Sequence, residues 1–174
     1  MSDDGSPPED ENKLIVQRRE KLGGLRKLGP AYPNDFVPEC TAAELIDEHA
    51  LRDKDFFEST DIKAVVAGRM VSKRIMGKAS FFQLQDTTAK IQVFVQIAAL
   101  GEDAYESFKH LDIGDIVGVT GKLFKTKVGE LTIKSNGVRL LTKSLRPLPE
   151  KFHGMTDTEP VSYTHLTLPT IYTV

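Results

Sequence analysis

Two short runs, FFQLQ at residues 81–85 and IQVFVQ at residues 91–96, decide the fold of this 174-residue chain. Successive side chains of a strand point to opposite faces, so each run has an inward set and an outward set. The inward set consists of Phe82, Leu84, Ile91, Val93 and Val95. The linker Asp86–Lys90 is short enough for a hairpin, which predicts that the two outward faces lie side by side.

The outward face of this hairpin mixes aromatic and amide side chains. It carries Phe81, Gln83, Gln85, Gln92, Phe94 and Gln96. Every nucleobase has a π-face that stacks on an aromatic ring, and amides pair with base edges, so the pattern is typical of a base-stacking platform. The alternative is that the two Phe residues pack under a helix or lie in a subunit interface, as outward aromatic residues often do.

Charge is distributed unevenly along the chain, although the net value is only −2. Residues 1–61 carry 8 Lys and Arg against 15 Asp and Glu, and residues 145–174 carry 2 against 3. Residues 62–144, which contain the hairpin, carry 13 against 7, a net charge of +6. Steering of a phosphate backbone requires positive charge on the segment that carries the stacking face, and this distribution supplies it.

The remaining pattern predicts a small β-barrel. Strand-like runs cover 62–74, 80–85, 90–96, 116–125 and 130–141, and a helical interval lies near 103–111. Three strands, a helix and two further strands is the order of the OB-fold, a five-stranded Greek-key barrel whose strand 2–3 face binds oligonucleotides. We therefore expect a mainly β domain over residues 59–144, with Phe81, Gln92 and Phe94 on its binding face.

A helical N-terminal extension is expected before the barrel, over residues 12–58. Residues 1–11 are polar and rich in helix breakers, which predicts a disordered lead-in. Helical spacing over residues 12–28, with Asn12 as N-cap, predicts an amphipathic helix. The polar face of that helix is expected to hold Arg18, Arg19, Lys21, Arg26 and Lys27. Such a face is usually solvated, and the alternative is that it contacts RNA. Thr41 and Glu44 fit a capping box, which predicts a second helix over about 42–51.

The sequence shows no pattern of a catalytic or metal site. Its one cysteine, Cys40, excludes an internal disulfide, and its four His residues have no spacing typical of a metal site or a catalytic triad. No glycine-rich phosphate loop follows a strand. The acidic N-terminus is unlike a signal peptide and no run reaches the length of a membrane span, so we expect a cytoplasmic protein without metal or cofactor.

Six motifs occur in one order along the chain. They are RREKL at 18–22, PNDF at 33–36, VAGRM at 66–70, MGKASF at 76–81, KTKVGEL at 125–131 and LRPLPEKFHG at 145–154. In this order and spacing they resemble the N-terminal anticodon-binding domain of bacterial-type lysyl-tRNA synthetases, from about Asn12 to Glu159. The resemblance implies an OB-fold that binds the anticodon of tRNA(Lys).

The resemblance also implies roles for five residues. Phe81 matches the family's stacking aromatic, Arg74 and Gln92 match the residues that read the central uridine, and Glu130 matches a carboxylate that reads a neighbouring base. Phe94 would supply a second stacking surface. These roles suit uracil, because Arg only donates, Gln donates and accepts, and a carboxylate accepts from N3–H. Phe81, Arg74 and Gln92 also match aspartyl and asparaginyl relatives, so the assignment to lysine depends on the N-terminal helix, the segment around Glu130 and residues 145–154.

By the same resemblance, the intact parent is a ligase that joins lysine to tRNA, dependent on ATP and magnesium and usually a homodimer. This chain should bind tRNA without catalysing the reaction. Residues 145–159 would lead toward a catalytic domain, and residues 160–174, PVSYTHLTLPTIYTV, look like one reading frame of a sequencing adapter and are expected to be an artefact. Two alternatives stay open: a free-standing OB-fold module that binds single-stranded nucleic acid, and a domain whose Phe face contacts another protein.

Overall fold

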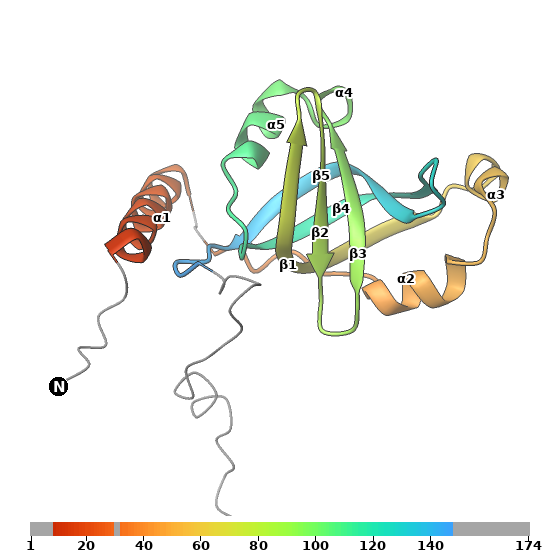
Figure 1. Ribbon diagram of the computed structural model, residues 1–174, viewed down its shortest axis with the longest axis horizontal. Coiled ribbons are helices and arrows are strands. Elements are labelled where there is room, and N and C mark those ends of the chain that lie inside the picture. Colours follow the sequence, from red (N-terminus) through yellow and green to blue (C-terminus); the bar gives the residue numbers. More distant parts are fainter. Residues whose placement is uncertain (1–8, 30–31, 148–174) are drawn as a thin grey trace, which may run out of the picture.

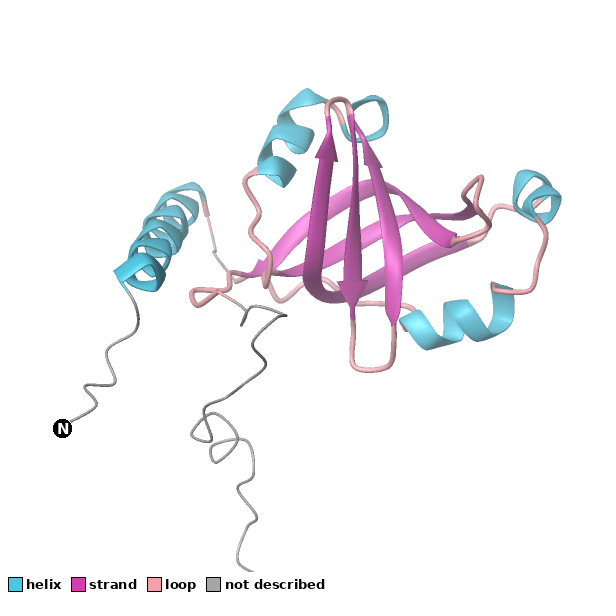
Figure 2. Ribbon diagram, viewed as in Figure 1, coloured by secondary structure: helices cyan, strands magenta, loops and turns pink. Residues whose placement is uncertain are grey.

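A computed structural model of the chain describes residues 9–29 and 32–147, and a closed five-stranded barrel lies at its centre (Figures 1 and 2). The strands are β1 (Lys63–Met76), β2 (Ala79–Gln85), β3 (Lys90–Gln96), β4 (Ile116–Lys125) and β5 (Leu131–Thr142). The helices are α1 (Glu9–Leu28), α2 (Ala42–His49), α3 (Lys54–Ser59), α4 (Ile97–Leu100) and α5 (Glu102–Lys109). The barrel order β1-β2-β3-β5-β4 confirms the predicted OB-fold, although two helices, α4 and α5, occupy the interval expected to hold one. The expected artefact at 160–174 and most of the expected linker at 145–159 lie outside the described residues.

Closure of the barrel depends on the long strand β1 and on a parallel pair. β1 pairs with β4 through its first half and with β2 mainly through its second half. The β1–β2 register shifts between Met70 and Ser72, and such a bulge lets a strand bend from one side of a barrel to the other. β3 pairs in parallel with β5, from Gln92 opposite Thr132 to Val95 opposite Ser135. This pair brings the start of β5 against the predicted hairpin.

The interior of the barrel is the inward face that the alternation predicts. Its hairpin members Phe82, Leu84, Ile91, Val93 and Val95 are all at most 2% exposed. Tyr105 of α5 closes the end of the barrel next to the β1–β2 turn. Its hydroxyl donates to the carbonyl of Gly77 at 2.9 Å and lies 2.6 Å from Oγ of Ser80. The buried phenol is therefore paired on both sides, as buried polar groups generally are.

The β2–β3 turn positions α2 as well as the hairpin. Asp86 accepts a hydrogen bond from the backbone N–H of Ala42 at 2.6 Å through Oδ2. Its other oxygen, Oδ1, accepts from the N–H groups of Thr88 and Ala89 at 2.7 and 2.9 Å. Burial pushes the pKa of the Asp86 carboxyl up, but these hydrogen bonds outweigh it and hold the pKa below its ordinary value. One carboxylate thus fixes a turn and a helix N-terminus together.

The predicted helices are present with shifted bounds. The capping box of Thr41 and Glu44 forms as predicted, and α2 begins directly after it. α1 begins at Glu9, so Asn12 lies inside the helix and the predicted cap there is wrong. Helices α3 and α4 have only six and four residues, too few to produce a helical period in the sequence.

α1 lies on the side of the barrel away from α2 and α3 (Figure 1). Arg18 is only 9% exposed, and its guanidinium donates to the carbonyls of Ser144, Arg146 and Ile113 at 3.3, 3.0 and 3.1 Å. The prediction that Arg18 belongs to a solvated face is therefore wrong, because its guanidinium donates to carbonyls that follow β5 and precede β4. No helix in the described part of the chain is both long and apolar enough to cross a membrane.

Candidate nucleic-acid interface

Phenylalanine rings from three strands form a row on the outer face of the barrel. Phe81 of β2 and Phe94 of β3 are register partners, with ring centroids 4.7 Å apart and an angle of 37° between the planes. Phe124 of β4 continues the row, its centroid 5.9 Å from that of Phe94. All three side chains are only partly buried. The row therefore offers accessible π-surface outside the core, so a base can stack on it without disturbing the packing of the barrel interior.

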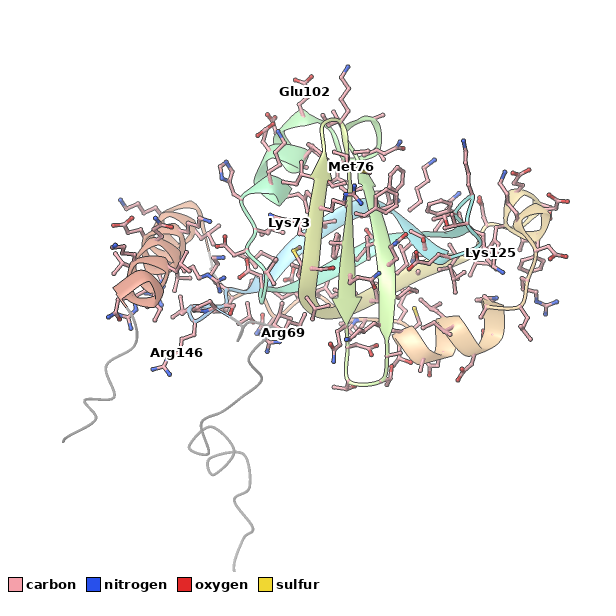
Figure 3. All side chains as sticks on the ribbon, viewed as in Figure 1. Arg69, Lys73, Met76, Glu102, Lys125 and Arg146 are labelled. Carbon is pink, nitrogen blue, oxygen red and sulfur yellow. The ribbon has the colours of Figure 1, made fainter. Side chains whose placement is uncertain are left out.

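A hollow of about 460 Å³ lies beside this row, between the strands and the β4–β5 turn. Its lining includes four of the predicted site residues, Arg74, Phe81, Gln92 and Glu130. They come from the three consecutive strands β1, β2 and β3 and from the turn before β5, which is distant from those strands in the sequence. Phe94 does not line the hollow, but its ring packs against the ring of Phe81, which does. Lys73 and Met76, also in the lining, lie along β1 toward the end of the barrel that carries α4 and α5 (Figure 3).

Amide and carboxylate groups are joined by hydrogen bonds in the floor of the hollow. Gln92 donates through Nε2 to Oε2 of Glu130 at 2.9 Å, and Gln83 donates through Nε2 to the other carboxylate oxygen at 3.5 Å. Gln83 and Gln92 are opposite each other in the β2–β3 register. On its far side Gln92 accepts through Oε1 from the hydroxyl of Thr132 at 2.9 Å. Gln92 is therefore held at both ends of its amide.

The β4–β5 turn fixes the backbone of Glu130. Thr126 and Glu130 are bonded twice, from Thr126 N to Glu130 O at 3.0 Å and from Glu130 N to Thr126 Oγ1 at 3.1 Å. Gly129 has φ +84°, a left-handed conformation that glycine adopts without a steric penalty, and it donates to the Thr126 carbonyl. The turn thus directs Glu130 to the hollow and leaves Val128 88% exposed at its tip.

The cations around the hollow differ in what they can reach. Lys73 donates to the carbonyls of Lys109 and Leu111 at the end of α5, and burial lowers the pKa of its ammonium group. It is therefore already occupied in holding α5. Arg74 and Lys127 are exposed in the lining. Those two side chains are the ones placed to meet a phosphate or a base in the hollow.

Two further residues of this surface, Phe124 and Thr132, were not among the predicted site residues. Val119 and Leu123 of β4 point into the core, and Phe124 lies at an alternate position that points outward. The strand alternation could therefore have predicted Phe124 on the outer face. Thr132 gives no such signal, because its contact with Gln92 exists only through the parallel β3–β5 pair. Among the residues that the structure describes, no group of three or more His, Cys, Asp or Glu side chains is arranged to hold a metal ion.

Comparison with known proteins agrees with this geometry. Residues 64–141, which cover nearly the whole barrel, match the tRNA anticodon family of OB-fold nucleic acid binding domains. The chain is 53% identical over 161 residues to a lysine–tRNA ligase of Azoarcus sp., and 56% identical over 151 residues to one of Thioalkalivibrio sulfidiphilus. These alignments cover 91% and 87% of the chain but only 32% and 30% of the relatives, so the chain spans about a third of their length. The barrel thus belongs to the tRNA anticodon-binding OB-fold family, in a chain homologous to part of the lysine–tRNA ligases.

Proposed function

We propose that this chain is the anticodon-binding part of a lysine–tRNA ligase and that its hollow takes the anticodon of tRNA(Lys). The observation that carries the proposal is the convergence of Arg74, Phe81, Gln92 and Glu130 on one hollow beside a row of aromatic rings. Single-stranded RNA loops are recognised in this way, by stacking of splayed bases and hydrogen bonds to their edges.

The roles within the hollow follow from the chemistry of each group. Phe81, extended by Phe94, stacks on a base, and Arg74 donates to the acceptors of uracil or to a phosphate. Gln92 has both donors and acceptors to offer a base edge. Glu130 accepts only, so it favours a base that presents an N–H group and repels one that presents a lone pair or a phosphate.

The intact protein, in this proposal, attaches lysine to tRNA with ATP and Mg²⁺, acts as a homodimer and is cytoplasmic. The relatives that support this are themselves lysine–tRNA ligases. The chain as given binds tRNA without catalysing the reaction. The +6 charge of residues 62–144 supports an RNA partner, since it lies on the barrel and not on the acidic N-terminal part.

Binding of labelled anticodon stem-loops, followed by fluorescence anisotropy at fixed salt, tests the proposal. The lysine stem-loop is compared with the same stem carrying an unrelated loop and with an unstructured oligonucleotide. Arg74→Ala should weaken binding of the lysine stem-loop roughly five- to hundredfold. Arg139→Ala is the matched control, because Arg139 is an exposed arginine of β5 paired with Asp35, away from the hollow. Equal binding of all three RNAs would favour a free-standing single-strand-binding module.

A further inference from the structure

Thr132 is a buried hydroxyl that bonds to a residue of the interface. Its side chain is 0% exposed, at the start of β5 opposite Gln92 of β3. Oγ1 donates to Oε1 of Gln92 at 2.9 Å and lies 3.2 Å from the carbonyl of Glu130. A threonine hydroxyl has one proton, so the shorter contact to Gln92 takes it. Thr132 itself does not line the hollow, and its shortest contact with a lining side chain is the Gln92 amide.

The carboxylate of Glu130 holds the same amide from its other end. It accepts from Nε2 of Gln92 at 2.9 Å. A carboxylate cannot donate, so a Gln92 amide turned through 180° would place Oε1 against Oε2 of Glu130, two acceptors without a proton between them. The same rotation would place Nε2 at the Thr132 hydroxyl, whose oxygen accepts as well as donates, so Thr132 by itself does not choose between the two orientations. The carboxylate of Glu130 thus sets which end of the amide faces it, and the hydrogen bond from Thr132 to Oε1 holds the other end in place.

The fixed orientation determines what Gln92 presents to a base. An amide has two N–H donors and two carbonyl lone pairs, and Glu130 and Thr132 use one of each. One N–H of Nε2 and one lone pair of Oε1 remain free for a base. Uracil presents an acceptor O4 beside the donor N3–H, whereas cytosine presents a donor N4–H₂ beside the acceptor N3. An amide held at both ends presents its remaining donor and acceptor in one fixed arrangement, which matches only one of these edges, whereas an amide held at one end shifts to accommodate either.

We propose that Thr132 is a positioning residue that locks the Gln92 amide and thereby gives the site its preference for uracil over cytosine. The hydroxyl does not contact the RNA in this proposal. It acts through Gln92. Without the hydroxyl, the carboxylate of Glu130 still accepts from Nε2, but Oε1 loses its partner and the amide is free to swing about that one remaining hydrogen bond. The inference depends on the proposed function for its RNA partner, but the lock itself is a property of the free protein.

The first measurement uses the full chain without RNA. The side-chain ¹⁵NH₂ resonances of Gln92, assigned with a Gln92→Ala sample, report its hydrogen bonds. Thr132→Val, which keeps the side-chain shape and removes the hydroxyl, should shift these resonances toward those of an exposed glutamine. Thr132→Ser should restore them, and Thr120→Val, which removes a threonine hydroxyl bonded to Asn136, should leave them unchanged. Gln92 resonances that do not move in Thr132→Val would overturn the claim that Thr132 holds the amide, independently of any result with RNA.

The second measurement compares stem-loops with uridine or cytidine at the central anticodon position. Wild-type protein and Thr120→Val should prefer uridine. Thr132→Val should lose roughly five- to hundredfold of that ratio, the value of one bidentate contact, and Thr132→Ser should regain it. A preference unchanged in Thr132→Val would contradict the specificity role while leaving the proposed function intact. Wild-type protein that binds neither stem-loop would contradict the proposed function. The NMR measurement, which needs no RNA, would then be the test of whether Thr132 holds the Gln92 amide.

Discussion

Phe81 and Phe82 are neighbours in β2 that face opposite sides of the sheet. Phe82 is 1% exposed in the core, whereas the ring of Phe81 packs at a tilt against that of Phe94 outside it. Phe82→Ala should therefore lower the free energy of unfolding by roughly 3–5 kcal/mol, as core truncations do. Phe81→Ala should leave the fold intact and weaken stem-loop binding by about 1–3 kcal/mol, the value of a lost base stack.

Urea denaturation and stem-loop anisotropy on the same two variants check this pair of predictions. Each variant serves as the control for the other, since both delete a phenyl ring from one strand. The reverse result, an unfolded Phe81→Ala and a stable Phe82→Ala, would contradict the outward assignment of Phe81.

Glu130→Gln should relax discrimination among anticodon bases more than it lowers affinity for the preferred one. The carboxylate accepts from Gln83 and Gln92 and cannot donate, whereas a glutamine in its place does both. The substitution also removes a negative charge near the RNA backbone, which offsets part of the affinity lost. Stem-loops with each anticodon base varied in turn, at fixed salt, measure the ratios. Ratios equal to those of the wild type would remove Glu130 from the interface.

At the scale of residues, the strand alternation was sufficient to place Phe81, Gln92 and Phe94 on one face. It was not sufficient for Glu130, which lies in a turn with no period and was assigned from the resemblance alone. The hydrogen bond between Gln92 and Glu130 joins β3 to the residue before β5, and it forms only when β3 and β5 pair in parallel. A long-range contact of this kind has no local sequence signal.

At the scale of elements, Asp86 joins the β2–β3 turn to α2. Asp86→Ala leaves the N–H groups of Ala42, Thr88 and Ala89 without their acceptor and should lower the free energy of unfolding by about 1–2 kcal/mol, as lost helix caps do. Asp55→Ala, in the first turn of the short helix α3, is the control for loss of an aspartate. Urea denaturation compares the two variants. Equal stability of Asp86→Ala and the wild type would show that water replaces the carboxylate at no cost.

The elements themselves were mostly predictable. The predicted bounds of residues 90–96 and 116–125 are those of β3 and β4. Buried positions alternate without interruption in β3, whereas in β4 burial is continuous from Val117 to Val119 and the pair Gly114-Asp115 marks where the strand begins. The error at Arg18 has a physical reason. An arginine on a charged helix is usually solvated, and only the carbonyls of Ser144, Arg146 and Ile113, all distant in sequence, make its burial favourable.

At the scale of the whole molecule, α1 is attached to the barrel through Arg18. Arg18→Ala removes a guanidinium that pairs with three carbonyls and should lower the free energy of unfolding by about 2 kcal/mol. Arg19→Ala, the exposed neighbour, should change it by much less. Hydrogen exchange of α1 amides identifies where the loss occurs. Faster exchange spread evenly over the barrel, with α1 unaffected, would contradict an attachment role.

A second attachment between α1 and the barrel is ionic and responds to pH. Asp112, before β4, accepts from Lys21 of α1 at 2.7 Å and pairs with Lys143, whose side chain is 2% exposed. Burial pushes the pKa of the Asp112 carboxyl up, but the hydrogen bonds from Lys143 and Lys21 outweigh it, and the pKa lies below the ordinary 3.8. Lys143 also pairs with the fully buried Asp115 at 2.8 Å.

A carboxyl whose pKa is lower in the folded state than in the unfolded state stabilises the fold above its unfolded pKa and loses that contribution as pH falls through the folded pKa. The free energy of unfolding should therefore decrease below pH 3.8, the unfolded reference value, as Asp112 becomes protonated. Asp112→Asn should be less stable than the wild type at neutral pH and should lose less on acidification, because its contribution is already absent. Urea denaturation of both proteins across this range, with hydrogen exchange of α1 at each pH, measures the difference. Parallel pH profiles for wild type and Asp112→Asn would show that the Lys21–Asp112–Lys143 contacts do not couple α1 to the barrel.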